Sequence, residues 1–216
     1  MRSGNSPPVQ GARSFIEARR RDQIVACAID TIAELGYGQA SLAQIAKRAG
    51  ISKGVISYHF SGKEDLIKDV FAAVIASGIA YMRPRILAES TGAGALRAYI
   101  ESSLAFMREH RKHVMTVREI LLNARRDDGS LLVDATAVHS EEAALERLLR
   151  RFQAEGEFRA FDPQVMAATI RAAIDAAPRR LATDPAFDLD SYGRELVTLF
   201  DLATRAEGKP LSRSNR

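Results

Sequence analysis

Residues 41–63 combine basic side chains, a tyrosine next to a histidine, and the signals for two short helices joined by a glycine. Ammonium, hydroxyl and imidazole groups bind phosphate oxygens, and a short helix can enter a DNA groove. The sequence contains no nucleophile elbow, phosphate-cradling glycine loop or HExxH pattern that would support catalysis. This combination favours DNA binding over an enzymatic function.

The helix signals in this stretch are local. Ser41 and Gln44 have the spacing of a capping box, Gly50 stands where a helix commonly ends in a left-handed conformation, and Ser52 can cap a second helix. The apolar periodicity agrees with these limits. The sequence therefore predicts helices over 42–49 and 53–59.

Ala46, Gly50 and Ile56 have the spacing of a helix-turn-helix motif. Such a motif needs a small residue where its helices cross, a glycine in the turn and an apolar anchor on the second helix. An ordinary helical hairpin would show the same spacing, so charge must decide. Residues 1–63 contain nine basic and four acidic residues, a net charge of +5, whereas the whole chain has 31 and 27, a net charge of +4, so the positive excess lies in this segment. That asymmetry favours a phosphate-facing domain.

The stretches RRDQIVACAIDTIAELGYGQAS and LAQIAKRAGISKGVISYHFSGKEDLI resemble the tetracycline-repressor (TetR) family of bacterial transcription regulators. The resemblance covers residues 19–67, and beyond it only length, helical character and the loop 155–163 agree. It implies a recognition helix in the major groove, with Lys53, Gly54 and Ser57 facing base edges. Many family members have an aromatic residue at the position of Ser57. The resemblance also implies contacts to the DNA backbone by Ser41, Ser52, Tyr58, His59 and Lys63.

The whole chain is expected to be all-α, with an N-terminal three-helix bundle and a larger C-terminal helical bundle. A second capping box, Ser61 with Glu64, starts the helix that follows the motif, and Pro84 should end it. The domains expected are an arm over 1–14, a DNA-binding domain over 15–62, an effector-binding and dimerisation domain over 63–207, and a tail over 208–216. About nine helices are expected, near 15–35, 42–49, 53–59, 63–82, 94–110, 113–126, 131–155, 163–182 and 189–207.

The family resemblance implies a ligand cavity within the C-terminal bundle. Methionine and aromatic side chains suit an adaptable apolar pocket, and a few polar groups would orient the ligand. Simple packing of the bundle would explain the same residues. The candidates are Tyr81, Met82, Tyr99, Phe106, Met107, His110, Met115, Arg118 and Asn123.

The last two helices are the expected surface of a homodimer. Small residues along the first of them permit close helix approach, and two such hairpins about a two-fold axis would form a four-helix interface. Internal packing is again the alternative. The residues expected at the interface are Met166, Ile170, Ile174, Leu196, Leu199, Phe200 and Ala203.

The remaining features exclude several classes of protein. The single cysteine, Cys27, allows no internal disulfide and fits a reducing cytoplasm, and it is expected to pack in the core. His110 and His113 lack further ligands at suitable spacing, so no metal or other cofactor is expected. Neither a secretory signal nor an apolar run long enough for a membrane span is evident.

The sequence therefore predicts a dimeric, ligand-responsive repressor that leaves a near-palindromic operator when an unknown small molecule binds. Two alternatives remain open: an architectural DNA-binding protein without an effector, and a helical enzyme that uses the bundle cavity. The effector, the operator sequence, the number of dimers on each operator and the sign of regulation are not encoded in recognisable patterns.

Overall fold

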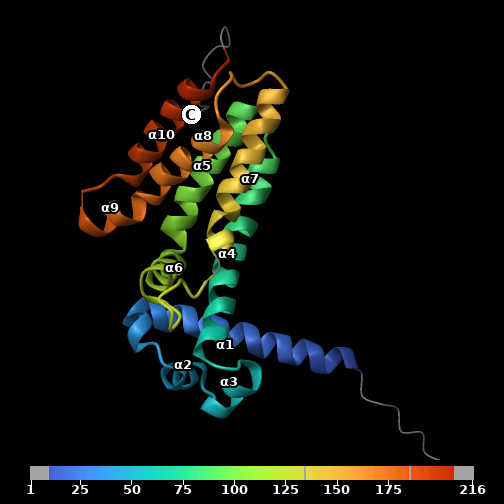
Figure 1. The fold of residues 1–216 in the computed structure, drawn as a ribbon, viewed down its shortest axis with the longest axis vertical. Helices are drawn as coiled ribbons and strands as arrows, with labels where there is room; N and C mark the ends of the chain where they lie inside the picture. The colour runs from blue at the N-terminus through green and yellow to red at the C-terminus, as the bar shows by residue number, and fades with distance from the viewer. Residues whose placement is uncertain (1–9, 134, 185, 207–216) are drawn as a thin grey trace, which may run out of the picture. The chain divides into compact units, whose positions relative to one another are not determined.

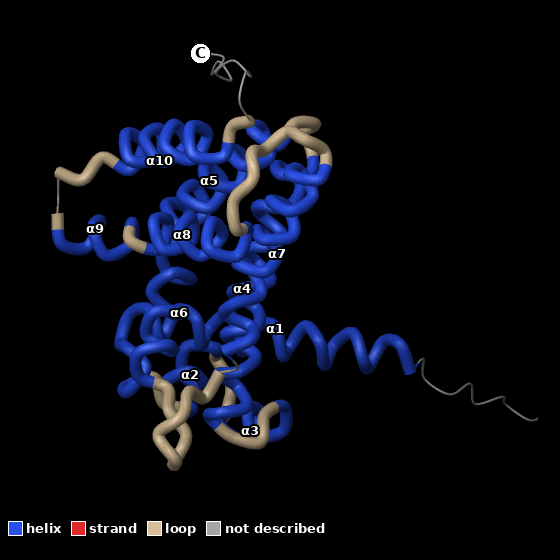
Figure 2. The backbone as a smooth tube through the Cα atoms, turned by 45° about the horizontal axis from the view of Figure 1, so that its top comes forward, coloured by secondary structure: helices blue, strands red, loops and turns tan. Residues whose placement is uncertain are grey.

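The computed structural model describes residues 10–133, 135–184 and 186–206. Ten helices and no strand occur in this part of the chain, so the predicted all-α class is confirmed (Figures 1 and 2). The helices are α1 (Gln10–Gln39), α2 (Leu42–Ala49), α3 (Lys53–His59), α4 (Lys63–Leu87), α5 (Gly92–Glu109), α6 (Arg111–Asn123), α7 (Ala135–Ala154), α8 (Pro163–Asp175), α9 (Ala177–Thr183) and α10 (Leu189–Thr204).

The helices divide into two compact units. The first unit comprises residues up to Ala73 together with Met115–Val133, and the second comprises Val74–Val114 and the residues from Asp134 onward. The expected boundary after residue 62 therefore differs from the observed division. The first part of α4 and the C-terminal part of α6 fold with the helix-turn-helix segment. The predicted arm and tail mostly lie outside the described residues, but α1 already begins at Gln10.

The helix-turn-helix forms as its local signals predict. The Ser41 hydroxyl accepts the Gln44 N–H at 3.2 Å, and the Ser52 hydroxyl accepts the Val55 N–H at 3.4 Å. Gly50 has φ 65°, and the next N–H, that of Ile51, bonds to the Ala46 carbonyl at 3.0 Å. The reciprocal half of the first capping box is absent, since the Ser41 N–H bonds to the Gln39 carbonyl instead. Two capped helices around a left-handed glycine result.

Replacing Gly50 with alanine should lower the free energy of unfolding by about 1 kcal/mol, because an L-residue is disfavoured in the left-handed region. The space around Gly50 is open, so a steric clash would not contribute. Gly38→Ala is the matched control, because Gly38 also has open space but lacks a positive φ. Urea unfolding of both variants measures the difference. Equal stability of the two variants would contradict this role of Gly50.

The start of α4 is capped differently from the predicted capping box of Ser61 with Glu64. The Ser61 N–H donates to the Asp65 carboxylate at 3.0 Å, and the first backbone bond of α4 runs from Leu66 to Gly62. Asp65 therefore replaces Glu64 as the residue that reaches back to the helix start. A carboxylate in the first turn still stabilises the helix end in either position.

Two proline effects correct the expected helix limits. Pro84 lies inside α4, which continues to Leu87, because the N–H of Ala88 still bonds to the Pro84 carbonyl. The expected helix over 163–182 is instead divided into α8 and α9. Pro178 lies at the start of α9 and has no N–H to donate to the preceding turn.

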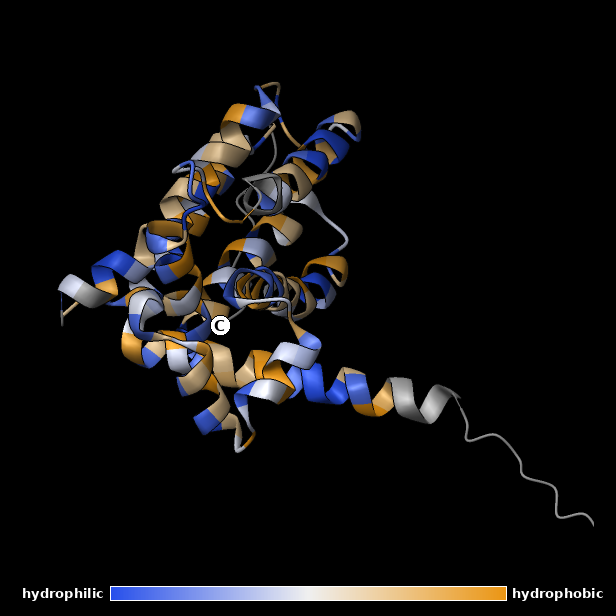
Figure 3. Ribbon diagram, turned by 60° about the horizontal axis from the view of Figure 1, so that its bottom comes forward, coloured by the Kyte–Doolittle hydropathy of each residue, from blue (hydrophilic) through white to orange (hydrophobic). Residues whose placement is uncertain are grey.

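The second unit has one apolar core, formed by α5, α7, α8 and α10. The helix α7 packs on α8, and α5 packs on α10. Figure 3 shows hydrophobic and hydrophilic residues alternating along the helices of the chain, as expected where a helix buries one face. The largest fully buried side chains of this core include Leu96, Ile100 and Leu145.

The helix α4 is, by length and composition alone, apolar enough to cross a membrane, with a mean hydropathy of 1.4 over 18 residues. No apolar run of this length was expected from the sequence, and the length and composition of α4 correct that expectation. However, 28% of this stretch is buried within the fold, and Val70, Phe71, Val74 and Met82 of the helix are at most 6% exposed, so part of its apolar surface is core. The same composition is usual in a core helix.

Candidate nucleic-acid interface and ligand-binding region

The helix α3 presents a polar face and buries its apolar residues. Ile56 is fully buried, and Phe60, which follows the helix, is 2% exposed, so Phe60 is a core residue. On the outer face Lys53, Gly54 and Ser57 are exposed together, and Ser52 caps the helix beside them. The structure therefore brings the predicted base-facing residues together on one surface.

Arg21 of α1 connects the C-terminal end of α3 to α4. Its Nε donates to Asp69 of α4 at 2.7 Å, and its Nη1 donates to the His59 carbonyl at 2.6 Å. The guanidinium also lies 4.2 Å from the centroid of the Phe60 ring. The Asp69 carboxylate raises the pKa of Arg21 further above its usual range. These contacts of Arg21 were not predicted from the sequence, because the partners of Arg21 are 38 and 48 residues away.

The predicted backbone-contacting residues of α3 have different surroundings. Tyr58 is 74% exposed, and its hydroxyl lies 3.3 Å from the carboxylate of Glu17. The ring of His59 packs edge-on against Tyr58, with centroids 5.1 Å apart. The hydroxyl of Ser57 donates to the Lys53 carbonyl at 3.2 Å, which occupies its hydrogen within the helix. Tyr58 is therefore accessible to a phosphate, whereas Ser57 offers mainly its small size and an acceptor.

Lys63, which is predicted to contact a phosphate, already has a partner within the protein. The ammonium group donates to the Tyr37 carbonyl at 2.7 Å and lies 4.2 Å from the centroid of the Tyr37 ring. Burial also lowers the pKa of Lys63. A lysine engaged in this way holds the last turn of α1, and its contact with a DNA phosphate stays a prediction that we do not carry into the proposal below. The position alone, at the start of a helix after the motif, could not show this.

Part of α6 belongs to the same unit as α3. The hydroxyl of Thr116, which is fully buried, donates to the Ile29 carbonyl at 3.0 Å. Glu119 accepts the N–H of Tyr37 at 3.0 Å and an amide N–H of Asn123 at 3.1 Å. Neither residue was a candidate from sequence, because the contacts join positions more than 80 residues apart.

Six of the nine predicted ligand-binding residues lie in the second unit. Met82, Tyr99 and Phe106 are buried, while Tyr81, Met107 and His110 are partly buried. The rings of Phe106 and His110 stack with centroids 4.4 Å apart, and Tyr81 packs against both. The His110 Nδ1 atom is buried without a hydrogen-bond partner among the described residues. Tyr81, Phe106 and His110 therefore form an aromatic cluster.

The other three predicted ligand-binding residues are placed differently. Met115, Arg118 and Asn123 belong to the first unit, and their side chains are exposed. They do not line an enclosed site, because each points to the outer face of α6 instead of its buried face at Thr116 and Ile120. Their contact with a ligand stays a prediction, and we do not carry these three residues into the proposal below. Among the described residues, no group of three or more acidic, histidine or cysteine side chains could hold a metal ion.

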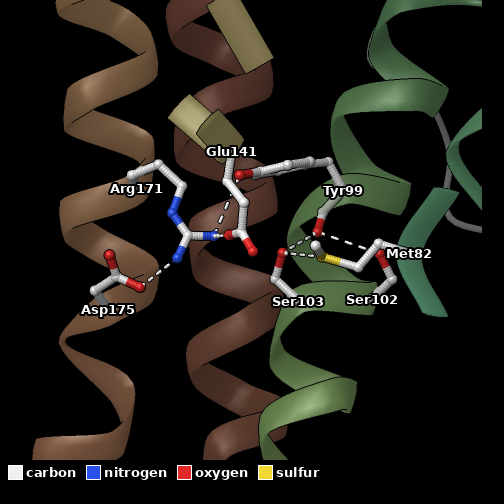
Figure 4. A network of polar contacts seen from close by, with 7 residues as sticks. All are labelled: Met82, Tyr99, Ser102, Ser103, Glu141, Arg171 and Asp175. Carbon is white, nitrogen blue, oxygen red and sulfur yellow. Dashed lines mark hydrogen bonds and ion pairs between the residues drawn. The ribbon is translucent and has the colours of Figure 1, made fainter. Parts of the chain in front are cut away.

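A buried ionic network lies next to the aromatic residues of the second unit (Figure 4). Arg171 of α8 contacts the Glu141 carboxylate of α7 at 3.0 Å, the Asp175 carboxylate at 2.5 Å and the Tyr99 hydroxyl at 3.2 Å. The side chains of Arg171 and Glu141 are only 15% and 16% exposed. Burial raises the pKa of Tyr99 to about 12.

The same network extends towards α4. The hydroxyl of Ser103 donates to the Tyr99 carbonyl at 2.7 Å and lies 3.1 Å from the sulfur of Met82. Sequence analysis included Tyr99 and Met82 but missed Arg171 and Glu141. A charged pair at i and i+4, Arg171 with Asp175, within an alanine-rich apolar helix was the available signal.

The network gives a testable pH dependence. Burial raises the pKa of Glu141 above its ordinary value of 4.5, although Arg171 opposes the shift. The folded protein then binds this proton more tightly than the unfolded chain, so the stabilisation is complete below the ordinary pKa and is lost as the pH rises through the folded pKa. Wild type should therefore lose stability relative to Glu141→Gln as the pH rises above 4.5. Urea unfolding across pH measures this.

Glu146→Gln is the control for the pH series, because Glu146 lies on the same helix and pairs with Arg150 at a more exposed position. Its pH profile should parallel that of wild type. Parallel profiles for wild type and Glu141→Gln would contradict the proton binding assigned to Glu141.

An open cavity of about 390 Å³ lies between α5 and α10. Its apolar lining comes from Leu104, Leu189 and Gly193. Arg108 and Asp190 also line it and form an ion pair 2.8 Å long. None of the nine predicted ligand-binding residues lines this cavity. The predicted set therefore does not coincide with this opening.

The predicted dimer residues are divided between core and surface. Ile170, Ile174, Leu196 and Phe200 are at most 6% exposed and pack in the core of the second unit, which corrects their assignment to a partner-facing surface. Met166 and Ala203 are partly buried, and Leu199 is 55% exposed. The apolar side chains that α8 and α10 leave most exposed are Val165, Leu199 and Leu202.

Comparison with known proteins identifies relatives of the N-terminal part. Residues 24–70 match the family described as bacterial regulatory proteins, tetR family. The chain is 34% identical over 85 residues to the HTH-type transcriptional regulator BetI 1 of Chromohalobacter salexigens, which covers 39% of this chain and 42% of that protein. It is 30% identical over 99 residues to the fatty acid metabolism regulator protein of Bacillus subtilis, covering 45% and 51%. The chain thus spans about half the length of these relatives or less.

Solved structures are similar over most of the fold. The fatty acid degradation regulator FadR of Bacillus halodurans superposes with a TM-score of 0.73 at 21% identity, covering 91% of this chain and 96% of that protein. FadR of Bacillus subtilis in complex with stearoyl-CoA superposes with a TM-score of 0.72 at 22% identity, covering 82% and 95%. At these identities the likeness establishes the shared fold.

Proposed function

Because the chain belongs to the TetR family of bacterial regulatory proteins, we propose that it is a dimeric, ligand-responsive repressor that reads DNA through α3. The observation that carries the proposal is the division of α3 into two faces. Ile56 and the following Phe60 are buried, while Lys53, Gly54 and Ser57 are exposed side by side. A helix held in this way can enter the major groove without losing its own packing.

The proposed contacts fall into two classes. Lys53 donates to base edges, Gly54 allows close approach of the backbone, and Ser57 leaves space for a base or a thymine methyl group. Ser41, Ser52, Tyr58 and His59 contact the DNA backbone, which fixes the position of the helix but carries little sequence information. The proposed location of both kinds of DNA contact is the cytoplasm.

The proposed dimer uses the faces that α8 and α10 leave unburied. Val165, Leu199 and Leu202 are 62%, 55% and 57% exposed. Exposure of three such apolar side chains to water on two adjacent helices is unfavourable. A two-fold axis through this surface would present two α3 helices to DNA. The operator should then contain two inverted half-sites about one helical turn apart.

The proposed effector acts through the second unit. The network around Arg171 and the cluster around Phe106 and His110 are buried polar and aromatic groups that a ligand could rearrange. A ligand that prefers one arrangement shifts the population towards it, and the affinity for DNA changes in proportion to that preference. Stearoyl-CoA, the ligand in the B. subtilis FadR structure, is the first compound to test.

Selection of duplexes from a random pool by the purified protein tests the DNA-reading part of this proposal. We expect enrichment of one sequence with inverted half-sites. No enrichment above the starting pool would contradict sequence-specific binding, and enrichment of a single unrepeated half-site would contradict the dimer. For the effector, any compound that raises the melting temperature of the free protein should also weaken the duplex complex, since the two bindings are linked.

A further inference from the structure

The backbone of Tyr37 is held from two sides within the first unit. Its N–H donates to the carboxylate of Glu119 on α6 at 3.0 Å, and its carbonyl accepts from the ammonium of Lys63 on α4 at 2.7 Å. The preceding residue, Gly36, has φ 79°, a conformation that favours glycine. One residue in the last turn of α1, directly after a kink at Gly36, is therefore fixed to two other helices by charge-assisted hydrogen bonds.

This turn determines where the helix-turn-helix begins. The N–H of Ala40 bonds to the Gly36 carbonyl at 3.2 Å, and the N–H of Ser41 bonds to the Gln39 carbonyl at 2.8 Å. Ser41 then caps α2, which leads through Gly50 to α3. Because these bonds follow one another without a flexible segment, a displacement of Tyr37 is transmitted to the start of α2.

Glu119 fits closely against the turn. Its carboxylate oxygen would lie 3.3 Å from a Cβ placed on Gly36, so the side chain packs on the glycine while it accepts the neighbouring N–H. Thr116, one turn earlier on α6, is a second anchor, since its buried hydroxyl bonds to the Ile29 carbonyl of α1 at 3.0 Å. The C-terminal part of α6 is thus attached to α1 at both its middle and its end.

We propose that Glu119 is a positioning residue for DNA reading: by holding the Tyr37 N–H, it sets the turn before α2 and hence the placement of α3 on the duplex. This inference rests on the proposed function. Residues Arg111–Val114 of α6 belong to the second unit, whereas the rest of the helix, which includes Glu119, belongs to the first. The helix therefore continues from the second unit into the DNA-reading unit. Glu119 itself does not touch DNA in this account.

Three substitutions separate the hydrogen bond from the charge. Glu119→Gln keeps the length of the side chain and an oxygen that can accept the N–H. Glu119→Asp keeps the charge but is shorter by one methylene, so it cannot reach Tyr37 in the same geometry. Glu119→Ala removes both. Asn123→Ala is the control, because it removes the other partner of Glu119 and leaves the Tyr37 contact in place.

The measurements are the affinity for the duplex that wild type selects from the random pool, its dependence on salt, and hydrogen exchange of the Tyr37 amide. Glu119→Asp and Glu119→Ala should each bind about tenfold more weakly, as expected for loss of one charge-assisted hydrogen bond. The salt slope should stay unchanged, because no phosphate contact is lost. The Tyr37 amide should exchange faster in both. Glu119→Gln and Asn123→Ala should resemble wild type.

Several results would overturn the inference. Wild-type affinity in Glu119→Asp would show that the hydrogen bond does not position α3, and a reduced salt slope would show that Glu119 acts through the phosphates instead. Equal weakening by Gln and Ala would assign the effect to charge. Because Glu119→Asp retains the charge, it serves as the decisive variant if the alanine variant does not fold. If wild type itself selects no duplex, the proposed function fails and this inference with it, whereas selection by wild type isolates the role of Glu119.

Discussion

Replacing Arg171 with alanine is expected to lower the free energy of unfolding by about 3–5 kcal/mol. The guanidinium is surrounded by the carboxylates of Glu141 and Asp175 and the hydroxyl of Tyr99 inside the second unit. Its removal leaves a largely buried Glu141 carboxylate without its cation, and an uncompensated buried charge is costly. Burial already raises the pKa of Glu141, whose side chain is only 16% exposed, so the site disfavours the charged form of this carboxyl group. Urea unfolding at neutral pH measures the loss.

The control for this prediction is Arg150→Ala. Arg150 pairs with Glu146 at i and i+4 on α7, but its side chain is 60% exposed, so the loss should be only about 0.3–0.5 kcal/mol. The triple variant Arg171→Met, Glu141→Gln and Asp175→Asn should recover much of the stability, because no charge is then left unpaired. A loss for Arg171→Ala no larger than that of Arg150→Ala would contradict the buried network.

Replacing Lys53 with alanine is expected to weaken binding to the selected duplex by about 1–3 kcal/mol, which corresponds to roughly 5- to 150-fold. The loss arises because the exposed ammonium of Lys53 would donate to base edges in the major groove. Base preference should relax at one position in each half-site. A repeat of the duplex selection with the variant, followed by affinity measurements, checks both effects.

Tyr58→Phe provides the contrast for Lys53→Ala. It removes only the exposed hydroxyl, so binding to the selected duplex and to random duplexes should weaken by the same factor. If Lys53→Ala also weakened all duplexes equally and left base preference unchanged, Lys53 would contact phosphates and the proposed register of α3 would be incorrect.

Local signals made the helix-turn-helix predictable. The hydroxyls of Ser41 and Ser52 bond within three residues, and Gly50 reaches its left-handed conformation through its immediate neighbours. Such features depend on a few adjacent residues, so they can be read from the sequence alone. The limits of α2 and α3 agree with the prediction for that reason.

Contacts between distant residues were not predictable in the same way. Lys63 has the sequence position of a phosphate ligand, yet Tyr37, 26 residues earlier, binds its ammonium group. An apolar stripe shows that a helix buries a face but does not identify what covers it. Ile170 and Phe200 were therefore predicted at a dimer surface, and the fold places them in the core.

The most direct test of DNA reading by α3 compares the affinity of the wild-type protein for its selected duplex and for a scrambled duplex of the same composition, across salt concentrations. The account predicts that the selected duplex binds at least about a thousandfold more tightly. It also predicts that the logarithm of each affinity falls linearly with the logarithm of the salt concentration. Equal affinity for the two duplexes at every salt concentration would contradict it.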